Sequence, residues 1–376
     1  MHYGGMVAYN IPHRLGRFMF ILKKRSFVNI FSIFSIAIFL TYYYSIFKIN
    51  YLNNDYQIGL DFLFEKSGFF IHQSPYINFP HFSNLSVLLI GVVNTLLVSM
   101  CGVISSVLVA TLITSFFISD IKINKFIVNF YVNSFRNIPL LVQILFWYEI
   151  LLHIMPTVHY SHNFLGILIN NRGIYIPYPL LSIWTVFLLI LLVVCLFSFK
   201  IKNFLFNIFS IFIFTFLILN SKWSIPFISK FNVKNGFRIY PEFLALYLSL
   251  TLYIGAFLSV NFISGYQSIP KATIEAAKAL GLSKAQQYYH VFLPVSLPKI
   301  IPPSLNQALN LIKDSSLGVA IGFPEIISLF AGTVLNQTGH SIEIILIVML
   351  IYLIINLIFS FIINQYNKKV RVWNEN

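Results

Sequence analysis

Charged residues are scarce in this sequence of 376 residues, where they make up only 10%. About a quarter of the residues in a soluble globular domain are charged, so this scarcity excludes that class. A soluble nucleic-acid-binding protein is excluded as well, because 58% of the residues are hydrophobic even though the net charge is +14. The composition therefore predicts a membrane protein, whose main partner is the lipid bilayer.

Cysteine is nearly absent, and the two that occur, Cys101 and Cys195, lie in apolar runs without metal-binding spacing. We therefore expect neither a disulfide framework nor a zinc site. His153, His159 and His162 lie close together in the sequence, but they lack a carboxylate and the i, i+4 spacing of a helical metal site. The sequence also lacks a G-x-x-x-x-G-K-[ST] loop for ATP phosphates and a cluster of catalytic groups, so we expect no catalytic site and no cofactor.

Long stretches without charged residues predict about eight transmembrane helices, because a spanning helix needs roughly 20 apolar residues. The fold class predicted from the sequence is therefore an all-α membrane protein. A kink is expected in the third span, where Pro139 removes a backbone donor. The predicted spans are 27–47, 85–118, 126–152, 174–199, 203–220, 243–264, 300–323 and 344–363.

Basic residues are distributed unevenly over the loops that join these spans. If both termini are cytoplasmic, sixteen Lys and Arg residues fall inside and seven fall outside. This distribution agrees with the preference of basic residues for the cytoplasmic side, so we predict that both termini are cytoplasmic. The stretch 222–238 opposes the tendency, because it places four basic residues outside.

The stretch 265–299, between the sixth and seventh spans, is polar and has the pattern of a helix, a break and a second helix. Gly281 permits a positive-φ helix end, Ser283 can cap the helix that begins at Lys284, and Pro294 is expected to close that second helix. Such a stretch can form a small knob at the membrane surface. An ordinary amphipathic loop is the alternative interpretation.

The first helix of this stretch is thin on one side because it carries Ala276 and Ala277, so another protein can approach it closely. Glu275 can pair with a basic partner. The spacing of these residues resembles the signature cytoplasmic loop of the membrane subunits of bacterial ABC importers, and it departs only at one position, where Val replaces the usual Ile. The residues that carry this resemblance are Glu275, Ala276, Ala277, Gly281, Val291, Leu293 and Pro294.

Other stretches resemble the polar amino-acid permease family. The two extra spans, together with residues 171–177, are similar to the longer permease of the general L-amino acid type. The stretches that carry this resemblance are 94–97, 135–141, 146–148, 171–177, 312–317, 328–333 and 336–339.

The resemblance implies a five-helix type I ABC importer core, with extra N-terminal and inserted helices, in the bacterial inner membrane. It implies import of L-amino acids by alternating access, driven by separate cytoplasmic ATPase subunits that hold the loop of Glu275. It also implies a second related permease, in a heterodimer, and a periplasmic amino-acid-binding protein. A self-sufficient secondary transporter or channel is the main alternative, although Glu149 and Asp314 are few intramembrane acids for carrying coupling ions.

The predicted organisation follows from the spans and the resemblance. It consists of a cytoplasmic tail at 1–26, an anchor at 27–47, a periplasmic loop with an interfacial segment at 48–84, the first part of the core at 85–152, inserted loops and a helix pair at 153–240, the second part of the core at 241–367 with the cytoplasmic loop 265–299, and a cytoplasmic tail at 368–376.

Ionisable residues inside predicted spans are candidates for function, because each costs roughly 2.5 to 3.5 kcal/mol at the bilayer centre. Lys313 and Asp314 can meet the two charges of an α-amino acid, or they can form an internal ion pair. Ser315 and Ser316 can line the same patch or return a hydrogen bond to their own helix. These residues are predicted to belong to a substrate path.

Arg136 and Asn137 precede the expected kink at Pro139 in the third span. A cation beside a kink suits a gate or a contact with a substrate carboxylate. The alternative is that Arg136 pairs with an acidic residue of a neighbouring span.

Overall fold

The computed structural model describes residues 31–46, 48–49, 59–71, 83–119, 121–181, 185 and 221–375. The chain divides into two units, Met1–Gly59 and Leu60–Asn376. In the first unit an apolar helix, Phe31–Ile46, lies within the first predicted span. All other elements belong to the second unit.

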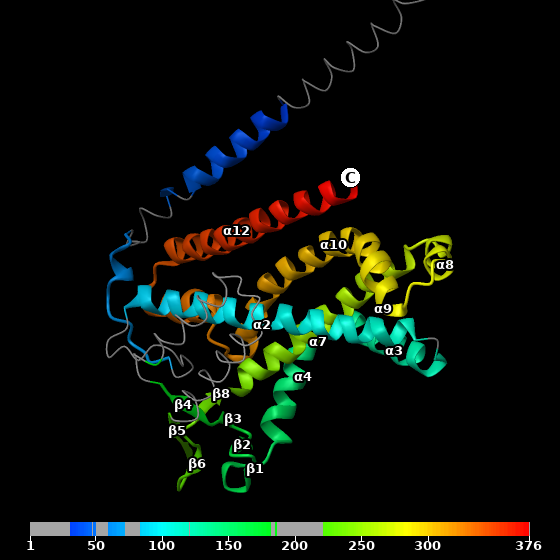
Figure 1. Cartoon of the computed structure of the whole chain (residues 1–376). Coiled ribbons are helices and arrows are strands. Elements are labelled where there is room, and N and C mark those ends of the chain that lie inside the picture. Colours follow the sequence, from blue (N-terminus) through cyan, green and yellow to red (C-terminus); the bar gives the residue numbers. More distant parts are fainter. Residues whose placement is uncertain are drawn as a thin grey trace, which may run out of the picture. The chain divides into compact units, whose positions relative to one another are not determined.

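Helices dominate the second unit (Figure 1). The α-helices are α2 (Asn84–Ile118), α3 (Lys122–Asn137), α4 (Leu140–His153), α7 (Pro241–Gln267), α8 (Lys271–Ala279), α9 (Lys284–Gln287), α10 (Leu293–Asp314), α11 (Leu335–Thr338) and α12 (Ser341–Glu375). The 3-10 helices are η1 (Asp61–Leu63), η2 (Val158–Tyr160) and η4 (Ser315–Ile321), and the π-helices are η3 (Tyr288–Phe292) and η5 (Ile327–Val334).

Three of the described helices, α2, α7 and α12, are long and apolar enough to cross a membrane, and a fourth span results if α3 and α4 count as one. The predicted number of eight spans is therefore not confirmed. The predicted span 203–220 and most of 174–199 lie outside the described residues. The centre of the unit is the packing of α2 along α7, where the side chains of Val98, Leu246 and Leu250 are fully buried.

The kink predicted at Pro139 is a complete break, because α3 and α4 meet at 103°. Pro139 and Ile138 both have extended backbone angles, and the break frees carbonyl groups at the end of α3. The side-chain amide of Gln143 donates hydrogen bonds of 2.9 Å to the carbonyl oxygens of Phe135 and Ile138. Gln143 thereby satisfies groups that would otherwise be unpaired in an apolar setting.

The predicted seventh span, an apolar run over 300–323 broken at Lys313 and Asp314, starts too late, because α10 begins at Leu293. Pro294 does not close the second helix of the loop, because α9, η3 and α10 follow one another with helical backbone angles throughout. A π turn at Tyr288–Phe292 widens the helix where the Pro294 ring would otherwise meet the carbonyl group four residues back. At the other end, α10 stops at Asp314 and η4 leads to Gly322 in the left-handed conformation.

The prediction of an all-α protein is wrong between α4 and α7, where the described residues form eight short strands. Ile174, at the start of the predicted span 174–199, lies in a strand and pairs with Ile169 and Ile239. Pro177 and Pro179 lack the backbone donors that a helix interior needs. A four-stranded antiparallel sheet has the order β1-β2-β3-β8, and β4 pairs with β5 and β6 with β7. The strands are β1 (His162–Phe164), β2 (Ile167–Asn170), β3 (Gly173–Ile176), β4 (Tyr178–Leu180), β5 (Lys222–Ser224), β6 (Phe227–Ile228), β7 (Val233–Lys234) and β8 (Phe237–Ile239).

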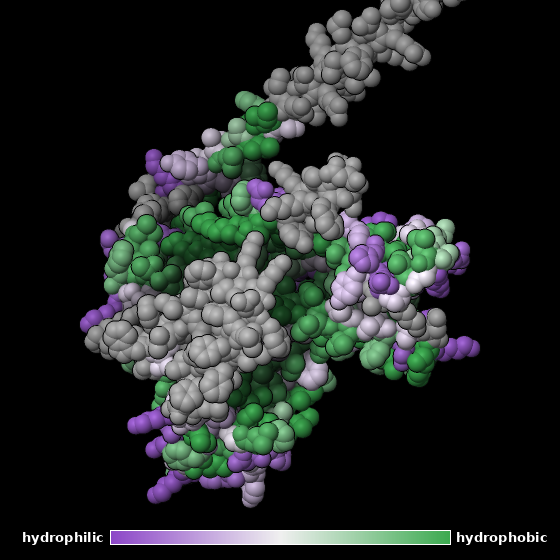
Figure 2. Space-filling view, in the orientation of Figure 1, coloured by the Kyte–Doolittle hydropathy of each residue, from purple (hydrophilic) through white to green (hydrophobic). Residues whose placement is uncertain are grey.

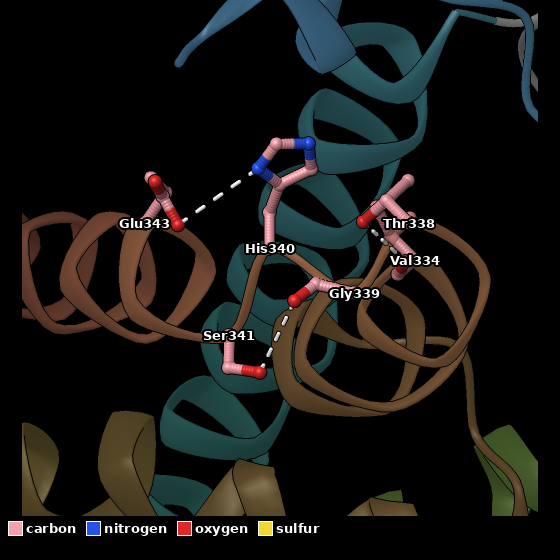
Figure 3. A network of polar contacts seen from close by, with 6 residues as sticks. All are labelled: Val334, Thr338, Gly339, His340, Ser341 and Glu343. Carbon is pink, nitrogen blue, oxygen red and sulfur yellow. Dashed lines mark hydrogen bonds and ion pairs between the residues drawn. The ribbon is translucent and has the colours of Figure 1, made fainter. Parts of the chain in front are cut away.

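A polar network joins α11 to α12 (Figure 3). Gly339 turns the chain with a φ of 72°, and its carbonyl oxygen accepts a hydrogen bond of 3.3 Å from the Ser341 hydroxyl. The His340 ring lies 3.9 Å from the Glu343 carboxylate and stacks on Phe62 of η1, with 4.6 Å between ring centroids. Because Phe62 is buried, this stack fixes the segment before α2 against the start of α12.

Candidate coupling loop and translocation site

Helix α8 ends in the manner that the sequence predicted. Gly281 has a φ of 71°, and its N–H donates to the carbonyl oxygen of Lys278. The next N–H, of Leu282, donates to the carbonyl oxygen of Ala277, which completes a Schellman motif. A Cβ atom added at Gly281 would meet nothing within 4 Å, so only the backbone angle demands glycine there.

The second helix of the loop begins at the predicted cap. The Ser283 hydroxyl accepts a hydrogen bond of 3.3 Å from the N–H of Gln286, whose side-chain oxygen accepts one of 2.9 Å from the N–H of Ser283. This reciprocal pair is a capping box. The two helices of the loop are therefore defined by local hydrogen bonds, independently of any partner.

The predicted residues of the loop 265–299 fall into two groups, one exposed to solvent and one packed inside the loop or against the helices. Glu275 and Ala276 are exposed, and 79% of the Leu280 side chain is exposed beside them. Ala277 is buried and, with Val291, lines a pocket of about 200 Å³ between the loop and the ends of α2 and α7. Leu293 and Pro294 are half-buried in the first turn of α10. These last two positions connect the knob to the core.

The position of the loop follows from the chain order. Helix α7 runs for 27 residues, or roughly 40 Å, from β8 at its start to α8 at its end. The strands and the loop therefore lie at opposite ends of α7. Figure 2 shows hydrophobic residues over the sides of the helices, and hydrophilic residues at the end near α8 and at the end near the strands.

Two of the predicted path residues, Arg136 and Asp314, lie on helices that pack against α7. The Arg136 guanidinium of α3 lies 4.9 Å from the ring centroid of Phe257, and Phe257 packs edge to face with Tyr253 at 5.0 Å. The Tyr253 hydroxyl lies within electrostatic range of both Arg136 and Asp314. We call Arg136, Tyr253 and Asp314 the inner polar cluster. It joins a cation, a hydroxyl and a carboxylate from α3, α7 and α10.

The other predicted path residues have different environments. Within the described residues, Lys313 forms no ion pair with Asp314 at 4.0 Å or less, and its side chain is exposed. Ser315 and Ser316 each donate a hydrogen bond of 2.7 Å to the carbonyl oxygen three residues back. These hydrogen bonds agree with the second of the two predicted roles of the serines, a hydrogen bond to the backbone of their own helix. Asn137 is exposed at the end of α3.

Comparison with known proteins gives the family. A model of the inner membrane component of binding-protein-dependent transport systems matches residues 190–372. The putative amino-acid ABC transporter permease protein YhdX of Escherichia coli K12 is 38% identical over 315 residues, which cover 76% of this chain and 78% of that protein. The general L-amino acid transport system permease protein AapQ of Rhizobium johnstonii is 31% identical over 345 residues and 86% of each chain.

This chain belongs to that family of inner membrane permeases. The resemblance that the loop and the other stretches suggested is thereby confirmed. The crystal structure of an amino acid ABC transporter with histidines aligns at a TM-score of 0.48, with 18% identity over 76% of the permease and 94% of that chain.

One buried residue of the permease was missed by the sequence interpretation. Glu325 lies between η4 and η5 with no exposed surface, and its oxygens accept hydrogen bonds of 2.8 Å and 2.7 Å from the N–H groups of Ile327 and Ser328. The Tyr352 hydroxyl of α12 lies 3.3 Å from the same carboxylate. Glu325 therefore caps η5 inside the core. Its position just beyond the apolar run 300–323 was the signal that could have identified it.

The stretch 94–97, which carried part of the resemblance, holds the same turn from α2. The Asn94 amide donates a hydrogen bond of 2.9 Å to the Pro324 carbonyl oxygen, and the Thr95 hydroxyl accepts one of 3.4 Å from the N–H of Ile326. Both side chains are buried. They position the junction of η4 and η5 and belong to α2, not to the loop 265–299.

Proposed function

We propose that this permease is the membrane-spanning subunit of an ATP-driven importer of L-amino acids that works by alternating access. The observation that carries the proposal is the coupling loop, a locally defined knob that presents Glu275, Ala276 and Leu280 to a partner. A cytoplasmic ATPase is the partner that suits this surface. The names of YhdX and AapQ support amino acids as the substrate class.

The inner polar cluster supports the proposed substrate class. An α-amino acid carries one positive and one negative group, and Arg136 and Asp314 offer the opposite charges on two helices that both pack against α7. Tyr253 adds a hydroxyl group that can donate or accept a hydrogen bond. We place the substrate path along this side of α7, facing a second related permease. A periplasmic binding protein delivers the amino acid to it.

The proposed orientation has the coupling loop and both termini in the cytoplasm and the strands outside. Single cysteines at Lys278 and Asn232, both exposed, test it in a variant in which Cys101 and Cys195 are replaced by alanine. An impermeant thiol reagent added from outside is expected to label only the cysteine at position 232, because the two sites lie at opposite ends of α7. Labelling at position 278 alone would reverse the orientation.

Uptake by the complete transporter tests the function. Reconstituted with its ATPase, second permease and binding protein, the wild type is expected to accumulate L-amino acids only when ATP is supplied. Asp314→Asn is expected to assemble normally but to lose about tenfold or more of the uptake, since it removes a charged contact with the substrate. Lys313→Met is expected to have a smaller effect, because Lys313 is exposed.

Asp61→Asn is the matched control, because this exposed acid lies outside the inner polar cluster. Its uptake should equal that of the wild type. Full uptake by the double variant Lys313→Met, Asp314→Asn would remove both residues from the substrate path. Transport by the permease alone, without ATPase or ATP, would instead favour a secondary transporter.

A further inference from the structure

The turn between β1 and β2 displays large apolar side chains in a strained conformation. Phe164 pairs with Ile167, so Leu165 and Gly166 alone form the turn, with φ values of 51° and 82°. A leucine is rare in the left-handed region, where glycine or asparagine is usual. Even so, 84% of Leu165 and 66% of Phe164 are exposed. Strain and exposed apolar surface at one tip are typical of a site that meets another molecule.

The surface around this tip is basic. The sequence contains no Asp or Glu between Glu149 and Glu242. We call the region of strands β1 to β8 the outer β platform. Among the described residues, its exposed Lys and Arg side chains are those of Arg172, Lys222, Lys230 and Lys234. A surface with charges of one sign attracts a partner with the opposite charge and raises the rate of encounter.

The outer β platform is joined rigidly to α7. Strand β8 ends at Ile239, and α7 begins at Pro241, so a single residue separates them. A Cβ atom at Gly173 would collide with the carbonyl oxygen of Ile239, and glycine therefore permits the close approach of β3 and β8. The Arg238 guanidinium donates hydrogen bonds of 2.9 Å and 2.7 Å to the carbonyl oxygen of Arg172.

The interior of the platform keeps this joint in place. Val158, Leu168, Tyr175 and Val233 form its buried core. Burial raises the pKa of the Tyr175 phenol, so the ring stays neutral while the Arg238 guanidinium lies 5.6 Å above its centroid. The tip therefore belongs to the same sheet as β8, which leads into the start of α7, and the other end of α7 leads to the loop 265–299.

We infer that the outer β platform docks the acidic face of the soluble binding protein that delivers the amino acid, with Phe164 and Leu165 as apolar anchors. This inference rests on the proposed function. Three observations favour this occupant: the platform has no acidic residue, it lies at the opposite end of α7 from the coupling loop, and transport in this family depends on a binding protein.

The double variant Phe164→Ser, Leu165→Gly tests the inference in the complete complex, held in nanodiscs. Glycine suits the turn better than leucine does, so the variant retains the fold while it loses the anchors. The probe is the binding protein that drives uptake by the wild-type complex. We expect its Kd to rise about tenfold or more and its stimulation of ATP hydrolysis to fall, with basal hydrolysis unchanged. Raising the salt concentration should weaken wild-type binding.

Phe70→Ser is the matched control, because this phenylalanine is 74% exposed but lies outside the platform. The complex with Phe70→Ser should bind the binding protein with the same Kd as the wild-type complex. Normal binding by the double variant would overturn the docking inference and leave the proposed function intact. A wild-type complex without uptake would instead contradict the proposed function, so the two failures are distinguishable.

A lipid surface is the other occupant that a basic, apolar region can meet. Leu165→Cys, in a variant with Cys101 and Cys195 replaced by alanine, can carry an environment-sensitive fluorophore. We expect its emission to shift to the blue only when the binding protein is added. Emission that is already blue-shifted, and is quenched by lipids with brominated acyl chains, would place the tip in the membrane and overturn the inference.

Discussion

Glu275→Lys and Gly281→Trp are each expected to reduce recovery of the ATPase with the permease by about tenfold or more. The first variant reverses the charge of an exposed residue on the coupling surface. The second puts a large side chain on the exposed loop, at a position where an added Cβ atom meets nothing within 4 Å, so the side chain obstructs a partner. The complex would be purified through a tag on the ATPase, and its two kinds of subunit would be quantified.

Gly339→Trp is a control that matches Gly281→Trp closely. Gly339 also has a left-handed φ, of 72°, and also has nothing within 4 Å of an added Cβ atom, but it lies at the joint of α11 and α12. Gly339→Trp therefore introduces the same backbone strain at a site outside the loop 265–299. Its recovery of ATPase should be normal. Normal recovery and transport by both loop variants would refute the docking role of the knob.

Glu325→Ala is expected to destabilise the folded permease by about 3 kcal/mol, because the N–H groups of the half-buried residues Ile327 and Ser328 both lose their acceptor and the fully buried side chain leaves a cavity. Glu325→Gln should cost less, since its amide retains one acceptor oxygen. Tyr352→Phe should cost least, because it removes only the contact of 3.3 Å. Thermal unfolding of the purified permease in detergent measures this order.

Glu65→Ala is the control for this series, because the Glu65 side chain is exposed and lies outside the core. Its midpoint of unfolding should be close to that of the wild type. A midpoint for Glu325→Ala equal to that of Glu65→Ala would show that the buried carboxylate does not stabilise the junction of η4 and η5.

The coupling loop was predictable because its structure is local. A positive-φ glycine and a serine cap act through hydrogen bonds to neighbours within five residues, so Gly281 and Ser283 have the conformations that their types favour. The break at Pro139 was predictable for the same reason. The angle of 103° between α3 and α4 was not predictable. Such a large angle leaves carbonyl groups of α3 without partners, and they are satisfied by hydrogen bonds from the side chain of Gln143 in α4.

The predicted span 174–199 is wrong at its start, over 174–180, because the prediction used hydropathy and gave little weight to Pro177 and Pro179. The strands there are stabilised by pairing with distant segments, as when Ile174 pairs with Ile239 and Leu180 with Lys222. Such pairing depends on which segments meet in space. Hydropathy along the chain carries no information about it.

The sequence by itself determined that this is a membrane protein, which family it belongs to, and the local form of the loop 265–299. Composition, motif spacing and helix caps can all be read along the chain without knowledge of distant contacts. The tertiary structure alone decided that Arg136 and Asp314 both lie within electrostatic range of Tyr253, that Glu325 caps a buried π-helix, and that a basic β platform is joined to the start of α7. Each of these features joins residues from different elements. Their contacts depend on helix packing and strand pairing, which no local pattern specifies.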